Sequence, residues 1–358
     1  MSLVAGWGGS WRLCVAGVLI RWVRGVGGVR VLRGCNAGTL GAVRDVSDGG
    51  WITATRVAVV AGKGGVGSTT VAAAMALAAA RDGADVLFVS VDGRPGVGPL
   101  LGGPPLTDTA VVLCELPGGG RVRGRTIPAS GAFADYLELK KVPRLVRRAA
   151  SAASLDVIAA ATPGLEHLLI LGKIKEMERS RDADLIIVDA PPAGHAAPFL
   201  RSSRALVDVV SDGAVREQAD EVSAMLADPA RTQGVLVTLP EETPVNEVIE
   251  LDADLRDELG MRMGPLVVNA CWPDRDGLAV QPRTAAKRQG VPLPNAVAAA
   301  LADSVAFGRA RLVQQREQLA RLDTAIPSPR LALSRLAVTR ITPSELRHLA
   351  DELAGDVA

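Results

Sequence analysis

A glycine-rich segment between Gly62 and Thr69 has the residue types and spacing of a loop that binds phosphate groups. It follows the pattern G-x-x-x-x-G-K-[ST], except that Ser68 stands where the pattern has lysine. In such loops backbone N–H groups surround the phosphates, the lysine reaches the β- and γ-phosphates, and the final hydroxyl binds Mg²⁺. The segment predicts a nucleotide site and, because the lysine is missing, weakened turnover. The predicted nucleotide-binding residues of the loop are Gly62, Lys63, Gly64, Gly65, Val66, Gly67, Ser68, Thr69 and Thr70.

The segments on either side of the loop support this prediction. Arg56–Ala61 is short, apolar and β-branched, which favours a strand, whereas Thr69–Ala80 is rich in strong helix formers. A strand, a glycine-rich loop and a helix in this order place the free N–H groups of the helix N-terminus against an anion. An ordinary glycine-rich turn is the less favoured alternative.

Lys63 directly follows the first glycine, as in the deviant form of the phosphate loop. In that form this lysine reaches the phosphates of a partner subunit across a dimer interface. A cation there can offset the charge that develops on the transferred phosphoryl group. Lys63 therefore predicts a dimer and a catalytic role, and a solvated loop lysine is the alternative.

Two carboxylates follow predicted strands. Asp92 comes after Val86–Val91, where it could orient or deprotonate a water in the crevice at the carboxyl ends of the strands. A turn aspartate is an equally good interpretation of Asp92, because Asp-Gly favours turns. Asp189 follows four apolar residues, Leu185–Val188, which makes it a Walker-B-like ligand for Mg²⁺, directly or through water.

The loop after Asp189 contains Pro191, Gly194 and His195 and could respond to the γ-phosphate as a switch, although an isolated histidine is more often a surface residue. Asn269 ends another apolar segment. Its amide offers a donor and an acceptor, which suit the edge of adenine, and an Asx turn is the alternative.

Short apolar segments alternate with helical stretches, the pattern of an α/β fold with a doubly wound, mainly parallel sheet. Residues 111–116 and 122–127 are expected to form a β-hairpin. Phe133–Ala153 and Glu166–Ser180 are expected to form helices of a helical subdomain at about 130–182, and Ser344–Ala354 a packing helix. The expected strands are Val57–Ala61, Val86–Val91, Leu155–Ala160, Leu185–Val188, Val235–Leu239 and Leu266–Val268.

Charge and cysteine content restrict the class of partner. The net charge of the 358 residues is +1, so neither nucleic acid nor an anionic membrane surface is expected as a partner. The four cysteines are scattered without a C-x-x-C pair, which argues against a zinc clip or a redox pair and fits a reducing cytoplasm.

Taken together, these segments resemble the arsenite-pump ATPase family, which also contains the ATPase that delivers tail-anchored membrane proteins. The segments that carry the resemblance are Gly62–Thr69, Asp92, Pro163–Glu166, Asp189–His195 and Val268–Asn269. The family's second switch reads D-T-A-P-T-G-H, and this chain has DAPPAGH at the matching place. The resemblance runs from about Arg56 to the C-terminus and looks especially like a bacterial branch described as anion-transporting ATPases.

The resemblance implies a P-loop NTPase fold with a helical subdomain, working as a nucleotide-gated cytoplasmic dimer with ATP and Mg²⁺. It implies that Gly62–Gly67 wraps the phosphates while Lys63 acts across the dimer. Thr69 and Asp189 would bind or support Mg²⁺. Asp92 would position the attacking water, and Asn269 would contact adenine.

The chain also departs from the family. Ser68 supplies no charge to the phosphates, the cysteines form no arsenite triad, and the C-x-x-C clip of the tail-anchor dimer is absent. Neither arsenite nor tail-anchor substrates are therefore supported. Within 51–358, the predicted P-loop ATPase domain, the leading interpretation is an ATP-binding subunit. Residues 1–50 differ in composition and are interpreted as a disordered extension or an over-long gene start, with a membrane-touching arm as the alternative.

The subunit could form a homodimer or a heterodimer with a paralogous ATPase subunit, with peripheral association to a membrane partner also possible. A non-catalytic regulatory subunit that pairs with an active paralogue is the alternative function, and Ser68 favours it. A partitioning-type ATPase shares the deviant loop. The chain has no basic C-terminal helix, however, and the Gly-His of its switch loop also weighs against that class.

Overall fold

The computed structural model describes residues 50–93, 96–139, 164–274 and 276–355, and the backbone of four strands nearer the N-terminus. The chain divides into two units, Met1–Asp45 and Val46–Ala358. The four strands of the first unit pair antiparallel in chain order, and the interpretation of residues 1–50 as an extension stays a prediction. They are β1 (Ser2–Val4), β2 (Ser10–Val15), β3 (Val18–Val23) and β4 (Arg30–Arg33).

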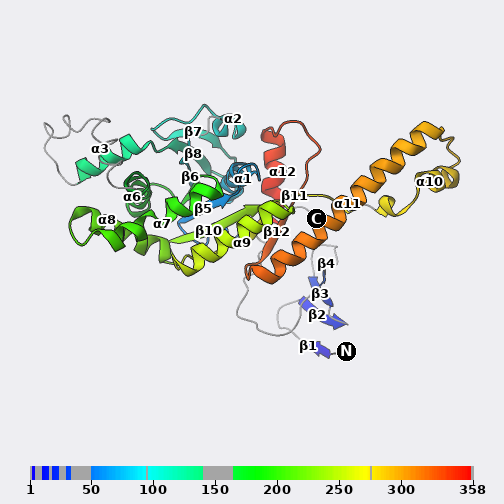
Figure 1. Ribbon diagram of the computed structural model, residues 1–358, viewed down its shortest axis with the longest axis horizontal. Coiled ribbons are helices and arrows are strands. Elements are labelled where there is room, and N and C mark those ends of the chain that lie inside the picture. Colours follow the sequence, from blue (N-terminus) through cyan, green and yellow to red (C-terminus); the bar gives the residue numbers. More distant parts are fainter. Residues whose placement is uncertain are drawn as a thin grey trace. The chain divides into compact units, whose positions relative to one another are not determined.

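The second unit is built on an eight-stranded sheet with the order β12-β11-β10-β5-β9-β6-β8-β7 (Figure 1). Neighbouring strands are parallel except at one edge, where β7 runs antiparallel to β8. The strands are β5 (Val57–Gly62), β6 (Asp85–Ser90), β7 (Val111–Glu115), β8 (Arg121–Thr126), β9 (Leu185–Asp189), β10 (Thr232–Thr238), β11 (Leu266–Cys271) and β12 (Arg330–Ser334).

The mainly parallel α/β fold predicted from the sequence is confirmed. The central strands β5, β9 and β10 are buried along their whole length, as expected for strands that helices cover on both faces. The predicted hairpin is present as β7 and β8, and the predicted strand Leu155–Ala160 lies outside the described residues. The sequence did not predict β12, an edge strand whose apolar run is only three residues long and of which only Leu333 is buried.

Helices cover both faces of the sheet (Figure 1). They are α1 (Ser68–Arg81), α2 (Val97–Leu100), α3 (Ala129–Leu139), α6 (Leu165–Ser180), α7 (Ala193–Val209), α8 (Ala214–Ala227), α9 (Glu242–Asp257), α10 (Pro282–Gln289), α11 (Asn295–Ala325) and α12 (Pro343–Ala354), with a 3₁₀ turn at Asp276–Ala279.

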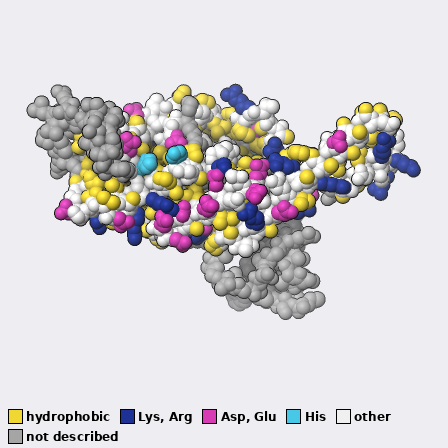
Figure 2. All heavy atoms as spheres, in the orientation of Figure 1, with side chains coloured by type: hydrophobic (Ala, Val, Ile, Leu, Met, Phe, Trp, Pro, Cys, Tyr) yellow, Lys and Arg dark blue, Asp and Glu magenta, His cyan; other side chains and the backbone are white. Residues whose placement is uncertain are grey.

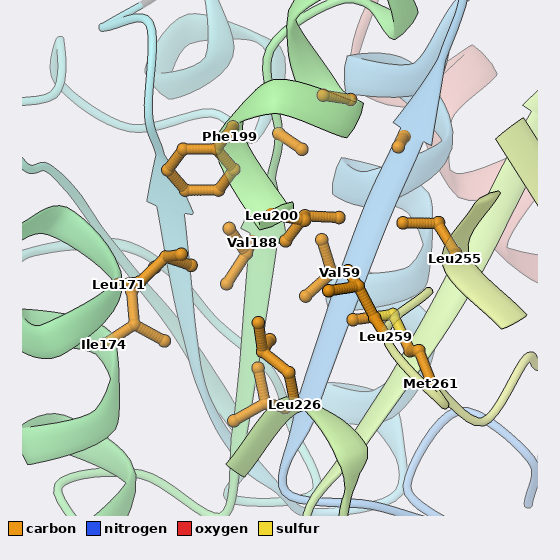
Figure 3. Packing of buried hydrophobic residues seen from close by; sticks show 14 of the residues in the cluster. Val59, Leu171, Ile174, Val188, Phe199, Leu200, Leu226, Leu255, Leu259 and Met261 are labelled. Atoms are coloured by element: carbon orange, nitrogen blue, oxygen red, sulfur yellow. The ribbon is translucent and has the colours of Figure 1, made fainter. Parts of the chain in front are cut away.

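Alternation along the strands separates two hydrophobic clusters. Val57, Val59 and Ala61 of β5 pack on one face with α6, α7, α8 and α9, and Ala58 and Val60 pack on the other face with α1 and α12. Successive side chains of a strand point to opposite faces, which explains this division. Figure 3 shows the first cluster, where β5 and β9 meet helices α6 and α7.

Helix α12 confirms the predicted C-terminal packing helix. Thr342 caps its N-terminus and forms a capping box with Glu345, and its apolar face is buried against α1. The buried residues of that face are Leu346, Leu349, Ala350 and Leu353.

The helical region has two described members of the predicted subdomain, α3 and α6. They are joined by an ion pair of 2.7 Å between Lys173 and Asp135. Residues 140–163, which hold the rest of the predicted helix Phe133–Ala153, lie outside the described residues. The subdomain boundaries at about 130–182 stay a prediction.

The surface of the second unit carries both signs of charge. Figure 2 shows Asp and Glu side chains interspersed with Lys and Arg over one face of the described residues. Among the described residues, every helix is too short or too polar to cross a membrane.

Candidate nucleotide-binding site

The loop between β5 and α1 has a backbone that only glycine adopts without strain. Gly65 and Gly67 have φ angles of 90° and 86°, in the left-handed region. The N–H of Val66 donates to the carbonyl of Lys63 at 3.3 Å, and the N–H of Val71 donates to the carbonyl of Gly67 at 2.9 Å. Helix α1 begins at Ser68 without a side-chain cap, so its first N–H groups face the loop and suit an anion.

Two glycines of the loop are required by close neighbours. A Cβ atom on Gly62 would lie 2.4 Å from the carbonyl oxygen of Val237 on β10. A Cβ atom on Gly67 would lie 2.4 Å from Nδ2 of Asn269 on β11. The loop is therefore held against the carboxyl ends of two neighbouring strands, where a parallel sheet binds ligands.

Thr69 and Asp189 come together at the start of α1. The Thr69 hydroxyl lies 3.1 Å and 2.9 Å from the two carboxylate oxygens of Asp189, to which it donates. Asp189 is 1% exposed at the end of β9, which pairs with β5 in the register Val60–Asp189. A hydroxyl and a carboxylate this close are oxygen ligands of the kind that Mg²⁺ takes.

The segment after Asp189 passes beside the phosphate loop. A Cβ atom on Gly64 would lie 3.9 Å from the Cβ of Pro192, so the phosphate loop and the loop after Asp189 are close enough to be in contact. Pro191 is buried, whereas Gly194 and His195 are exposed in the first turn of α7. The structure thus brings the predicted switch loop to the predicted phosphate loop, with His195 on the surface.

Asp92 lies two residues beyond the end of β6 and is exposed. The following Gly93 has a φ angle of 63°, as in a turn, and Arg94 and Pro95 lie outside the described residues. Strand β6 is the neighbour of β9, so Asp92 and Asp189 follow adjacent strands at the same edge of the sheet.

Asn269 supports the phosphate loop directly. Its Nδ2 donates to the carbonyl of Val66 at 2.8 Å, and its Oδ1 accepts from the N–H of Ala270 at 2.8 Å. Ala270 has a φ angle of 53°, which places it in the left-handed region. The amide bonds within its own turn, where the sequence offered an Asx turn as the alternative to a contact with adenine. It also holds the phosphate loop, a structural role that the sequence analysis did not predict.

We expect Asn269→Ala to lower the melting temperature without nucleotide by about 2–4 °C, because a hydrogen bond to Val66 worth about 1 kcal/mol is lost. Asn269→Asp keeps the acceptor for Ala270 but loses the donor to Val66, so it should also melt at a lower temperature than the unmodified chain. Thermal unfolding without nucleotide checks the result. A melting temperature that stays unchanged, together with an altered preference for ATP over GTP, would instead favour recognition of adenine alone.

A cavity of about 710 Å³ opens beside Thr69, between α2 and the segment that leads into α12. This volume lies within the range of about 300–1,000 Å³ that is usual for small-molecule sites. Sequence analysis missed the segment Arg340–Pro343, because it carries no motif and joins the site only through the packing of α12 on α1. The lining residues are Thr69, Gly96, Val97, Pro99, Leu100, Arg340, Ile341, Thr342 and Pro343.

Lys63 lies at the other side of the loop and forms an ion pair with Glu247 of α9. The side chains are 33% and 36% exposed, so the pair is partly shielded from water. Within this subunit the predicted catalytic lysine is thus engaged with a carboxylate.

The two cysteines whose side chains are described, Cys114 and Cys271, are free thiols. Burial raises the pKa of Cys271 to about 11 and also raises the pKa of Cys114. Both thiols are therefore protonated near neutral pH. Among the described residues, no three histidine, cysteine or acidic side chains are grouped as a metal site.

Comparisons with known proteins agree with this geometry. A family model described as anion-transporting ATPase matches residues 55–97, which include the phosphate loop and Asp92. ATPase BagA of Mycobacterium tuberculosis is 34% identical over 313 residues, 79% of this chain and 89% of that protein. An arsenical pump-driving ATPase of Escherichia coli is 27% identical over 195 residues, 54% of this chain and 31% of that protein. With its sheet, its strand–loop–helix unit and this similarity along most of its length, the chain is a P-loop α/β protein that belongs to the anion-transporting ATPase family.

Proposed function

We propose that the chain is an ATP-binding subunit of an anion-transporting-type ATPase that works as a nucleotide-gated dimer in the cytoplasm, with hydrolysis weakened by Ser68. The observation that supports this most is the Thr69–Asp189 pair at the start of α1, directly beside a glycine loop with left-handed Gly65 and Gly67. Loop N–H groups, a hydroxyl and a carboxylate are groups that bind the phosphates and the Mg²⁺ of a nucleoside triphosphate.

The roles of the residues follow from their positions. Gly62–Gly67 and the first N–H groups of α1, including those of Ser68, Thr69 and Thr70, would bind the phosphates. Thr69 and Asp189 would hold Mg²⁺, which when bound neutralises charge on the β- and γ-phosphate oxygens. Asp92 would orient the water, and Pro191, Gly194 and His195 would change position with the γ-phosphate.

Ser68 supports a second candidate function, a non-catalytic regulatory subunit. Ser68 is only 5% exposed and lies at the first position of α1, where the loop pattern places a lysine. Such a subunit would keep the loop geometry and donate Lys63 to a paralogous subunit whose own loop contains the lysine. The same chain would then act in a heterodimer instead of a homodimer.

The deciding experiment is to measure ATP binding and phosphate release by the full chain, alone and mixed with a paralogous subunit that has an intact G-K-[ST] loop. ATP binding with slow release by the chain alone supports the first function. Release that rises only in the mixture, and falls when Lys63 is replaced by glutamine in this chain, supports the regulatory function. A chain that binds no ATP would overturn the first function, and release by the mixture that does not depend on Lys63 of this chain would overturn the second.

We expect Asp189→Asn to remove most of the Mg²⁺ dependence of ATP binding. The amide keeps the size of the side chain and can still pair with the Thr69 hydroxyl, but it loses the charge that attracts the metal. Titration with a fluorescent ATP analogue with Mg²⁺ and with EDTA checks this. Asp184→Asn, which changes an acid at the opposite end of β9, should bind like the unmodified chain, and an equal effect of both variants would contradict the assignment.

A further inference from the structure

We propose that Glu247 is a positioning residue that holds Lys63 within its own subunit when no nucleotide is bound and releases it when nucleotide arrives. The inference rests on the proposed function, because it concerns how Lys63 becomes available to a partner subunit's phosphates. It adds a residue to the site that lies outside every motif of the sequence.

The sheet brings the two residues together. Strands β5 and β10 are adjacent and parallel, and Gly62 pairs in register with Val237. Lys63 is the first residue after β5, so it leaves the sheet beside the end of β10. Helix α9 starts four residues after β10 ends, and Glu247 lies in its second turn, where its carboxylate accepts from the Lys63 ammonium.

Helix α9 is a firm support for this carboxylate. Its inner face is buried in the first hydrophobic cluster through Val245, Val248, Leu251 and Leu255. Beside Glu247, Asn246 accepts a hydrogen bond of 2.6 Å from Arg321 of α11. Because packing and this hydrogen bond hold α9 in place, the Glu247 carboxylate has a fixed position beside Lys63.

The far end of α9 is joined to the helix that follows the switch loop. Arg201 of α7 lies 2.7 Å from the carboxylates of both Asp254 and Glu258. Helix α7 begins at Ala193, immediately after the loop that follows Asp189. These ion pairs fix α9 at its far end as well, so release of Lys63 from Glu247 depends on competition from the phosphates and not on a movement of α9.

The Lys63–Glu247 ion pair is weak enough for a bound nucleotide to displace it. Ion pairs at partly exposed sites change an equilibrium by only about two- to fivefold. A partner's nucleotide offers the ammonium several charged phosphate oxygens at once, and each makes a charge-assisted contact like that of the carboxylate. The ligand can therefore shift Lys63 from Glu247 to the phosphates, because it interacts with only one of the two arrangements.

A zero-length carbodiimide cross-link followed by peptide mass spectrometry tests the contact in the full chain. We expect a Lys63–Glu247 cross-linked peptide without nucleotide, and at least a twofold smaller yield with Mg²⁺ and a non-hydrolysable ATP analogue. Glu247→Gln should abolish the peptide. Glu250→Gln, an exposed position three residues along the same helix, should leave it unchanged. A missing Lys63–Glu247 peptide, or a yield that nucleotide does not change, would overturn the proposal.

Nucleotide affinity gives the second measurement. Glu247→Gln is expected to tighten binding of the ATP analogue about two- to fivefold, with no gain when Lys63 is already replaced by glutamine. The Glu250→Gln control should bind as the unmodified chain does. If the unmodified chain binds ATP and Glu247→Gln does not change its affinity, Glu247 does not hold Lys63 and the proposed function stands. If the unmodified chain binds no ATP, both the proposed function and the role of Glu247 fail.

Discussion

Replacing Ser68 with lysine is expected to raise ATP affinity about 10- to 100-fold, because each charge-assisted hydrogen bond to a phosphate contributes about 1.5–3 kcal/mol. Phosphate release should rise by a larger factor, on the order of a hundredfold, since a cation at this place stabilises charge that grows in the transition state. The position is favourable for this change, because Ser68 begins α1 beside the left-handed Gly67 and its neighbour Thr69 contacts Asp189. Isothermal titration and a phosphate-release assay measure the two effects.

Ser68→Gln is the matched control, because glutamine is also a long side chain but carries no charge. If the loop lacks a positive charge, this variant should gain little ATP affinity and no turnover. The nucleotide-free lysine variant should be less stable than the unmodified chain, because Ser68 is buried and the new ammonium has no phosphate partner. Robust turnover by the unmodified chain that lysine does not increase would contradict this prediction. It would show that another cation, such as Lys63, already serves the site.

Gly67→Ala is expected to abolish measurable ATP binding while the sheet stays folded. Its φ angle of 86° costs an alanine about 1–2 kcal/mol, and the new Cβ would meet Nδ2 of Asn269 at 2.4 Å. Asn269 must then move, and Val66 loses the hydrogen bond that shapes the loop. Circular dichroism checks the fold, and titration with a fluorescent ATP analogue checks the binding.

Gly102→Ala is the control that separates the cost of a left-handed alanine from the change in shape of the phosphate loop. Gly102 has the same φ angle of 86°, but a Cβ atom there would have nothing within 4 Å. This variant should show a small loss of stability and full nucleotide affinity. Equal nucleotide affinity of the two variants would mean that the shape of the phosphate loop does not depend on Gly67.

The local features of the fold and site could be predicted from the sequence. The loop glycines, the buried strands Val57–Gly62 and Leu185–Asp189, and the amphipathic C-terminal helix each show their chemistry within a short window. The pairing of Thr69 with Asp189, 120 residues along the chain, follows once the strands are assumed to be parallel neighbours. These features depend on hydrophobic periodicity and turn chemistry, which a single sequence contains.

The remaining features depend on contacts that no short window contains. Glu247 is one of several acids in α9, and only the packing of that helix selects it as the partner of Lys63, 184 residues away. The bond from Asn269 to Val66 spans 203 residues and depends on the strand order around β5. Helix α11 escaped prediction because its 31 residues bury only Ala298, Leu312, Gln318 and Leu322, too few to give a helical pattern.

The packing of α12 on α1 has a consequence for synthesis of the protein. Helix α1, whose start would meet the phosphates, is covered by the C-terminal helix, and Arg81 forms an ion pair with Asp351, 270 residues further along the chain. A nascent chain still inside the ribosome tunnel would leave the apolar surface of α1 uncovered and the wall at Arg340–Pro343 missing. We therefore expect the nucleotide site to be completed only once α12 has emerged from the ribosome and packed on α1, so that the subunit cannot bind ATP before then.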